Sequence, residues 1–213
     1  IGAMVGPEAF TEVRYLAHAK QLQALDRLPE LAREFKEVFG RDSGGLVKPY
    51  QLDDAETIVI ALGSVLGTIK DTVDDLRAEG VKIGVLGITS FRPFPIEAIR
   101  AVTGHAKRIV VIEKCFAVGI GGIVSRDVRS AVQSRPQPVY AVVAGLGGRA
   151  ITKASLHKLL LQATEDKLEL LTFLDLDWGI VNRVLEREKQ QRRSGPVAEG
   201  ILRDIGTVSS KIG

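Results

Sequence analysis

Cysteine and histidine are scarce in this chain of 213 residues, and each shortage excludes a kind of site or cross-link. Cys115 is the only cysteine, so the chain forms no internal disulfide, which is typical of a reducing compartment. One thiolate also cannot hold an iron–sulfur cluster, which normally takes four. The three histidines are scattered and none has a zinc-binding spacing, so we expect no metal site.

Long hydrophobic runs are missing too. No run approaches the roughly 20 apolar residues that span a bilayer, and the longest, such as residues 57–62, have the length of a strand. Residues 1–6 contain no basic segment leading into an apolar stretch, so we expect no secretory signal peptide. We therefore expect a cytoplasmic protein with no membrane partner.

Charge of one sign is also limited. The formal net charge is only +3, too small to predict a nucleic-acid partner. Residues 183–193 hold five basic and two acidic side chains, which accounts for the whole excess. Alternating charges of this kind are typical of a solvated helix, and a patch for phosphate or an acidic partner is the alternative.

Hydrophobic patterning indicates an α/β fold over residues 46–165. Strand-length apolar runs alternate there with helical stretches, and the β-branched runs suit strands buried on both faces. Such alternation predicts βαβ units and a parallel sheet with right-handed crossovers. The predicted strands are 56–62, 81–88, 108–112 and 139–143, and the predicted helices are 65–79, 96–102, 123–133 and 152–163.

Two helical segments flank this domain. Residues 1–45 form a predicted helical linker, in which a helix over 7–39 ends at Gly40. Residues 166–213 form a predicted helical tail, with one helix over 179–193 and a short one over about 197–205. The tail has little core of its own, so we expect it to dock on the domain or on a partner chain.

Two turns are candidate anion sites, because ligands gather at the carboxyl ends of strands in an open parallel sheet. Gly63 and Ser64 precede a predicted helix whose backbone N–H groups can bind an anion. Gly119, Gly121 and Gly122 approach the dinucleotide pattern G-x-G-x-x-G, but the last position is Val124 and the next strand lacks a terminal acid. A tight turn that requires small residues is the alternative at both places.

Two further strand ends carry patterns of interest. Gly145 to Ala150 satisfies G-x-G-x-x-A, but the next helix is expected to begin later, with Thr152 as its N-cap, which favours close backbone packing. Glu113 and Cys115 follow the third predicted strand, where a carboxylate and a thiol can be catalytic. Without a histidine partner, we favour a structural role, with Cys115 as a small buried residue. We predict no catalytic residue in this chain.

Several motifs together carry a family resemblance. Over about residues 1–150 the chain resembles the C-terminal part of the α chain of pyruvate (2-oxoacid):ferredoxin oxidoreductases. The phrase Arg92 to Pro95, with its surrounding spacing, is the most specific of these motifs. The others are Ile1 to Glu8 with Glu12 to Tyr15, Phe39 to Arg41, Tyr50, Asp54 to Glu56, Gly63–Ser64, Val73 to Arg77 with Gly80, Phe91, the glycines at 119, 121 and 122, and Gly145 to Arg149.

The resemblance implies a transketolase C-terminal-like domain, which is a three-layer α/β/α sandwich with a mostly parallel sheet. It also implies a complex that converts pyruvate and coenzyme A to acetyl-CoA and carbon dioxide, and that passes electrons through iron–sulfur clusters to ferredoxin. Thiamine diphosphate with Mg is expected in that complex, and the implied partners are a β subunit, ferredoxin-type and γ subunits, and further copies of the complex.

In that family, the cofactor lies between the β chain and an N-terminal domain of the α chain that has no counterpart in this sequence. No catalytic residue is therefore carried over, and the isolated chain is expected to be inactive and to bind none of these cofactors alone. Cys115 is a departure, since many relatives have arginine there. The 2-oxo acid stays open, with pyruvate as the default. The alternatives are a stand-alone nucleotide-binding module, or the C-terminal domain of a 2-oxoacid dehydrogenase or transketolase.

Overall fold

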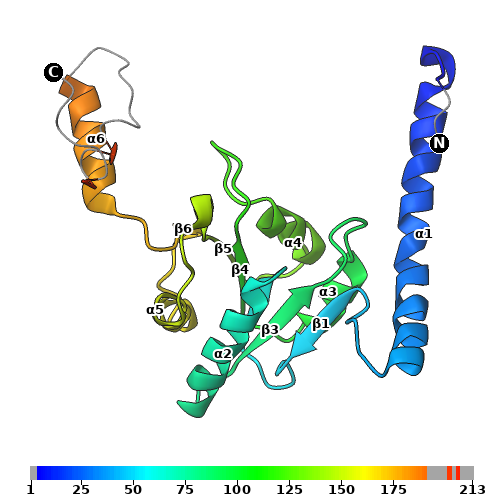
Figure 1. Cartoon of the computed structure of the whole chain (residues 1–213), viewed down its shortest axis with the longest axis horizontal. Coiled ribbons are helices and arrows are strands. Elements are labelled where there is room, and N and C mark those ends of the chain that lie inside the picture. Colours follow the sequence, from blue (N-terminus) through cyan, green and yellow to red (C-terminus); the bar gives the residue numbers. More distant parts are fainter. Residues whose placement is uncertain (1–3, 191–200, 203–204, 207–213) are drawn as a thin grey trace. The chain divides into compact units, whose positions relative to one another are not determined.

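A six-stranded sheet is the centre of the first of two structural units, which comprise residues 1–174 and 175–213 (Figure 1). The computed structural model of the chain describes residues 4–190, 201–202 and 205–206. Its strands are β1 (Val47–Tyr50), β2 (Thr57–Ala61), β3 (Ile83–Ile88), β4 (Arg108–Glu113), β5 (Val139–Val143) and β6 (Leu171–Phe173). Their order is β1-β3-β2-β4-β5-β6, with β1 antiparallel to β3 and the remaining pairs parallel.

Helices cover both faces of this sheet. They are α2 (Val65–Ala78), α3 (Ile96–Val102), α4 (Val124–Val132) and α5 (Lys153–Thr164). One buried cluster joins α2 and α5 to one face, and a second joins α3 and α4 to the other face. Every residue of β2, β3 and β5 is buried, because these strands have a helix layer on each side. The predicted α/β/α sandwich with a mostly parallel sheet is confirmed.

The predicted N-terminal helix is α1, Pro7–Phe39. It ends where expected, because Gly40 adopts a left-handed conformation with φ of 64° and its N–H donates to the carbonyl of Lys36. No described residue of α1 is buried. Burial within this unit therefore does not account for the apolar side chains of α1.

Two strands of the sheet were not predicted. In β1, the inner residues are exposed and Pro49 occupies an edge position, so neither a continuous apolar run nor alternation marks it. The three residues of β6 are half-buried and lie within the predicted tail 166–213, beyond the predicted domain 46–165. Both segments are strands because a neighbouring strand pairs with them, and their own sequence does not indicate it.

The second unit contains α6, Trp178–Gln190. Asp177 begins this helix, since its Oδ1 accepts the backbone N–H of Ile180 at 3.0 Å. Residues 191–193 of the predicted helix, and most of the predicted helix 197–205, lie outside the described residues. In the described part of the chain, no helix combines the length and apolarity needed to cross a membrane.

Candidate functional site

The chain reverses its direction of winding between β2 and β4, which are neighbours in the sheet. From β2 it passes through α2 to β3 on one side, and from β4 through α4 to β5 on the other side. The connections after β2 and β4 therefore diverge and leave a crevice at the carboxyl ends of these two strands. Open α/β sheets bind ligands at such a switch point.

A cavity of about 240 Å³ lies at this crevice. It brings together two groups that the sequence analysis treated separately, the turn at Gly63–Ser64 and the segment 113–115. The turn at 119–122 does not line it. The lining residues are Leu62, Gly63, Ser64, Val65, Ile112, Glu113, Lys114, Cys115, Val124 and Ile151.

The turn at Gly63 and Ser64 leads directly into α2. Gly63 has φ of 81°, a left-handed conformation that glycine adopts without strain, and Ser64 is the N-cap residue with no side-chain capping bond. The residues at the start of α2 and Lys114 thus line the same cavity. Such a combination favours a negatively charged group.

Glu113, which also lines the cavity, has a structural role. Its buried carboxylate accepts the backbone N–H groups of Ile123 at 2.8 Å, Val124 at 2.7 Å and Ser125 at 3.0 Å. These are the donors at the start of α4, where a negative charge is stabilised by the helix dipole. The chain's own carboxylate thus takes the position that an anionic ligand of the 119–122 turn would need.

Gly122 makes this arrangement possible. A Cβ atom at this position would collide with Oε1 of Glu113. The glycine is therefore required for close approach of the side chain, rather than for binding a phosphate. Sequence reasoning missed this pair because the acid precedes the turn and belongs to a different element. The available signal was a carboxylate at the end of a buried strand.

The expectation that Cys115 is buried is wrong. Its side chain is exposed, because β4 ends at Glu113 and the chain leaves the sheet there. The turn at Gly145 is followed by a short 3-10 helix, Leu146–Gly148, and α5 begins only at Lys153. The predicted N-cap is confirmed, since Thr152 Oγ1 accepts the backbone N–H of Ser155 at 3.1 Å.

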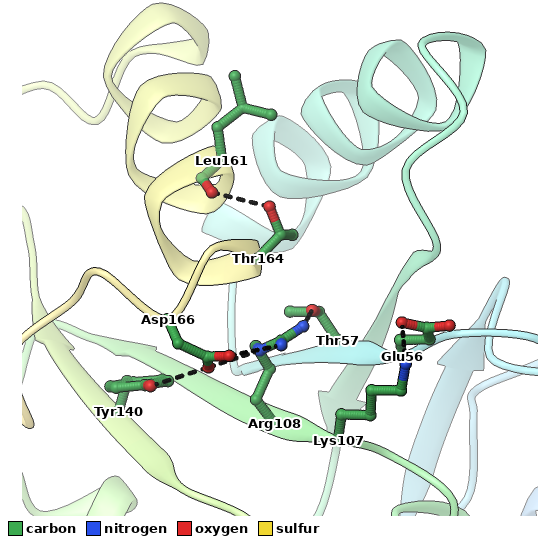
Figure 2. A network of polar contacts seen from close by, with 8 residues as sticks. All are labelled: Glu56, Thr57, Lys107, Arg108, Tyr140, Leu161, Thr164 and Asp166. Carbon is green, nitrogen blue, oxygen red and sulfur yellow. Dashed lines mark hydrogen bonds and ion pairs between the residues drawn. The ribbon is translucent and has the colours of Figure 1, made fainter.

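At the opposite, amino end of the strands lies a polar network, shown in Figure 2. Arg108 on β4 donates two hydrogen bonds of 2.8 and 2.7 Å to Asp166, and a third of 3.1 Å to the hydroxyl of Thr57 on β2. The Tyr140 hydroxyl donates to the same Asp166 at 3.1 Å. At its side, Lys107 donates to Glu56 at 2.7 Å.

Ionic hydrogen bonding shifts the pKa values in this network. The bond from Arg108 lowers the pKa of Asp166, and the same pair raises the pKa of Arg108. The pKa of Tyr140 is raised, mainly by burial and secondly by the hydrogen bond to Asp166. Because the network lies at the end away from the crevice and links three strands to the turn after α5, we interpret it as structural.

The crevice does not fit a magnesium–diphosphate group. Magnesium prefers carboxylate and other oxygen ligands, and the one carboxylate in the cavity lining already accepts three backbone N–H groups. Across the part of the chain that the structure describes, no group of three or more His, Cys, Asp or Glu side chains is placed to hold a metal ion. No chemical step through such a cofactor is assigned to this chain.

The sheet order, the two helix layers and the crevice define an open α/β domain. Residues 55–156 match the family model described as pyruvate:ferredoxin oxidoreductase core domain II. These residues belong to that domain family, as their motifs indicated.

Curated relatives agree. The pyruvate synthase subunit PorA of Methanosarcina barkeri is 42% identical over 162 residues, which are 75% of this chain and 40% of that protein. The ketoisovalerate oxidoreductase subunit VorA of Pyrococcus abyssi is 32% identical over 154 residues, 71% of this chain and 39% of that protein. The chain thus spans less than half the length of these relatives. A solved split-gene transketolase, an inactive β4 tetramer, is similar with a TM-score of 0.45 and 20% identity, over 55% of this chain and 41% of that chain.

Proposed function

We propose that this chain is the second core domain of the α subunit of a 2-oxoacid:ferredoxin oxidoreductase. The observation that carries the proposal is the 42% identity over 162 residues to a PorA subunit, together with the domain match over residues 55–156. The complex oxidatively decarboxylates a 2-oxo acid to acyl-CoA and carbon dioxide and reduces ferredoxin in the cytoplasm. Pyruvate is the preferred substrate of the proposal, since the PorA relative is more similar than the VorA relative.

Within the complex, the role of this chain is assembly rather than chemistry. Its single cysteine cannot hold an iron–sulfur cluster, so the clusters belong to other chains, as does thiamine diphosphate with Mg. The buried carboxylate at the crevice is held by three backbone donors, which suits a cap and not an acid–base group. The partners are the β, γ and ferredoxin-type subunits, in a complex that itself oligomerises.

A chimeric subunit tests this function. The matching segment of the Methanosarcina barkeri PorA subunit is replaced by this chain and produced with the other subunits of that pyruvate synthase. We expect ferredoxin reduction that depends on pyruvate and coenzyme A, and no activity from a PorA subunit that lacks the segment. An assembled chimera that reduces ferredoxin with ketoisovalerate, and not with pyruvate, would change the proposed substrate. An inactive but assembled chimera would contradict the function.

Calorimetry on the isolated chain tests its non-catalytic role. We expect no heat of binding when thiamine diphosphate and Mg are titrated into the 213-residue chain. Tight binding would show that the cofactor site lies within this domain. Decarboxylation of a 2-oxo acid by the chain alone would contradict the role more directly.

A small-anion site at Gly63 and Ser64 is a second candidate, favoured by the cavity that these residues share with Lys114. A volume of about 240 Å³ is below the roughly 300–1,000 Å³ of drug-sized ligand sites, so it suits inorganic phosphate better than a whole nucleotide. Gly119, Gly121 and Gly122 are less favoured, because Glu113 occupies the start of α4. Titration with phosphate and with ADP, followed by thermal unfolding, separates the two ligands.

A further inference from the structure

Helix α1 exposes many large apolar side chains along most of its length. Its 33 residues span about 50 Å, and none of those residues is buried. A soluble monomer rarely leaves a large continuous apolar patch uncovered. The exposed large apolar residues of the helix are Phe10, Tyr15, Leu16, Leu22, Leu31, Phe35, Val38 and Phe39.

Most of the apolar residues of α1 form one stripe. Leu28, Leu31, Phe35 and Val38 follow one another at intervals of three and four, the spacing of a helix face that packs against another surface. The Phe35 and Phe39 rings lie 4.8 Å apart and widen its C-terminal part. At about 100° per residue, the stripe comprises Phe10, Val13, Ala17, Ala24, Leu25, Leu28, Leu31, Ala32, Phe35, Val38 and Phe39.

The polar face of α1 indicates a protein partner. The helix carries six acidic and five basic residues, and Arg27 forms ion pairs with Glu30 and Glu34 along the helix. Helices that lie on anionic membranes, and surfaces that bind nucleic acid, carry a marked excess of basic residues. The mixed charges of α1 lack this excess, so the stripe suits a protein surface.

The area of the α1 stripe indicates whether it packs against a second copy of the chain or against another part of the same subunit. A stripe about 50 Å long and about 10 Å wide presents on the order of 500 Å². Two copies paired by this stripe bury about 1,000 Å², less than the roughly 1,600 Å² of a standard stable interface. A contact within one polypeptide needs less area, because the connection between its parts supplies a high effective concentration.

We infer that the α1 stripe docks on the part of the α subunit that this chain does not cover. The matched segment is only 40% of the PorA relative, so more than half of such a subunit is available as the opposing surface. This inference rests on the proposed function, because the occupant is the remainder of that subunit. The docking surface buries the stripe and leaves the opposite side of α1 in solvent.

Hydrogen exchange on two proteins tests the docking. The amides of residues 24–39 are compared in the 213-residue chain and in the PorA chimera described above. We expect exchange at least about tenfold slower in the chimera, because docking suppresses local opening of the helix. Equal rates in the two proteins would overturn the inference, and slow exchange in the chain alone that increases with its concentration would assign the stripe to a second copy.

A matched pair of variants locates the surface. Leu31 and Leu22 are 44% and 45% exposed and lie nine residues apart, about two and a half turns, so they face opposite directions on the same helix. Leu31→Lys in the chimera should return the exchange to within about twofold of the chain alone, while Leu22→Lys leaves it slow, because lysine and leucine have similar helix propensity. Equal effects of both variants contradict docking through the stripe. Protection of α1 in a chimera that does not reduce ferredoxin supports the docking and counts against the proposed function alone.

Discussion

The carboxylate of Glu113, the last residue of β4, accepts a 2.7 Å hydrogen bond from the backbone N–H of Val124, the first residue of α4. The loop between them contains the glycine-rich turn at 119–122, which brings the start of α4 back to the Glu113 carboxylate. The same carboxylate lines the crevice between β2 and β4. One buried charge therefore fixes the start of a helix and the shape of the candidate site.

Replacing this carboxylate should weaken the fold. Glu113→Gln removes the charge and one acceptor oxygen, and brings amide donors toward backbone donors. We expect the free energy of unfolding, measured by urea denaturation, to fall by about 1–3 kcal/mol. Glu97→Gln is the control, because that side chain is 80% exposed in α3 and its loss should cost less than about 0.5 kcal/mol. Similar losses for both variants would contradict the capping role.

A methyl group at Gly122 should be poorly tolerated. Gly122→Ala places Cβ against the Glu113 carboxylate, which cannot move without breaking its three hydrogen bonds. We expect a loss of about 1–3 kcal/mol in urea unfolding. Gly67→Ala is the matched control within α2, where a Cβ meets nothing within 4 Å, and it should stabilise by about 0.5–1 kcal/mol. An unchanged free energy of unfolding in Gly122→Ala would contradict this interpretation.

The Arg108–Asp166 pair should make the free energy of unfolding depend on pH in the acidic range. Asp166 has a pKa below its ordinary value of about 4, so it releases its proton more readily in the folded chain. Its contribution is present above that ordinary value and is lost as the pH falls through the lower folded pKa. We expect Asp166→Asn to cost about 1–2 kcal/mol at pH 7, discounted because the aspartate is half exposed. As the pH falls below the ordinary aspartate pKa, the difference from the unsubstituted chain should shrink.

The backbone at this position does not complicate the test. Asp166 has φ of 54°, which asparagine tolerates as well as aspartate does. Asp53→Asn, at an exposed loop position, serves as the control for the same substitution away from the ion pair. A difference between Asp166→Asn and the unsubstituted chain that grows toward low pH would have the wrong sign for this ion pair.

The exposed thiol of Cys115 should react in the folded protein. We expect one equivalent to react with a disulfide reagent under native conditions, at a rate within about tenfold of the unfolded chain, because access does not require opening of the core. Cys115→Ser should change the free energy of unfolding by less than about 0.5 kcal/mol. Reaction only after urea is added would show that the thiol is covered.

The central part of the fold could be predicted from the sequence. The strands at 57–61, 83–88 and 139–143 are buried on both faces, and such burial favours apolar residues at nearly every position. Some helix ends could also be predicted from local residues, since the Thr152 hydroxyl caps α5 and Gly40 ends α1. These features are encoded within a few neighbouring residues.

The pairing of distant residues was decided only by the tertiary structure. Arg108 and Asp166 are 58 residues apart, and Glu113 meets α4 only because the loop folds back on β4. β1 and β6 acquire their conformation from neighbouring strands, and the cavity joins turns after two strands that the sequence separates by a helix, a strand and another helix. Local propensity and hydrophobic period determine which segments become helices and strands. Which side chains then meet depends on how the sheet is ordered, and no local pattern carries that order.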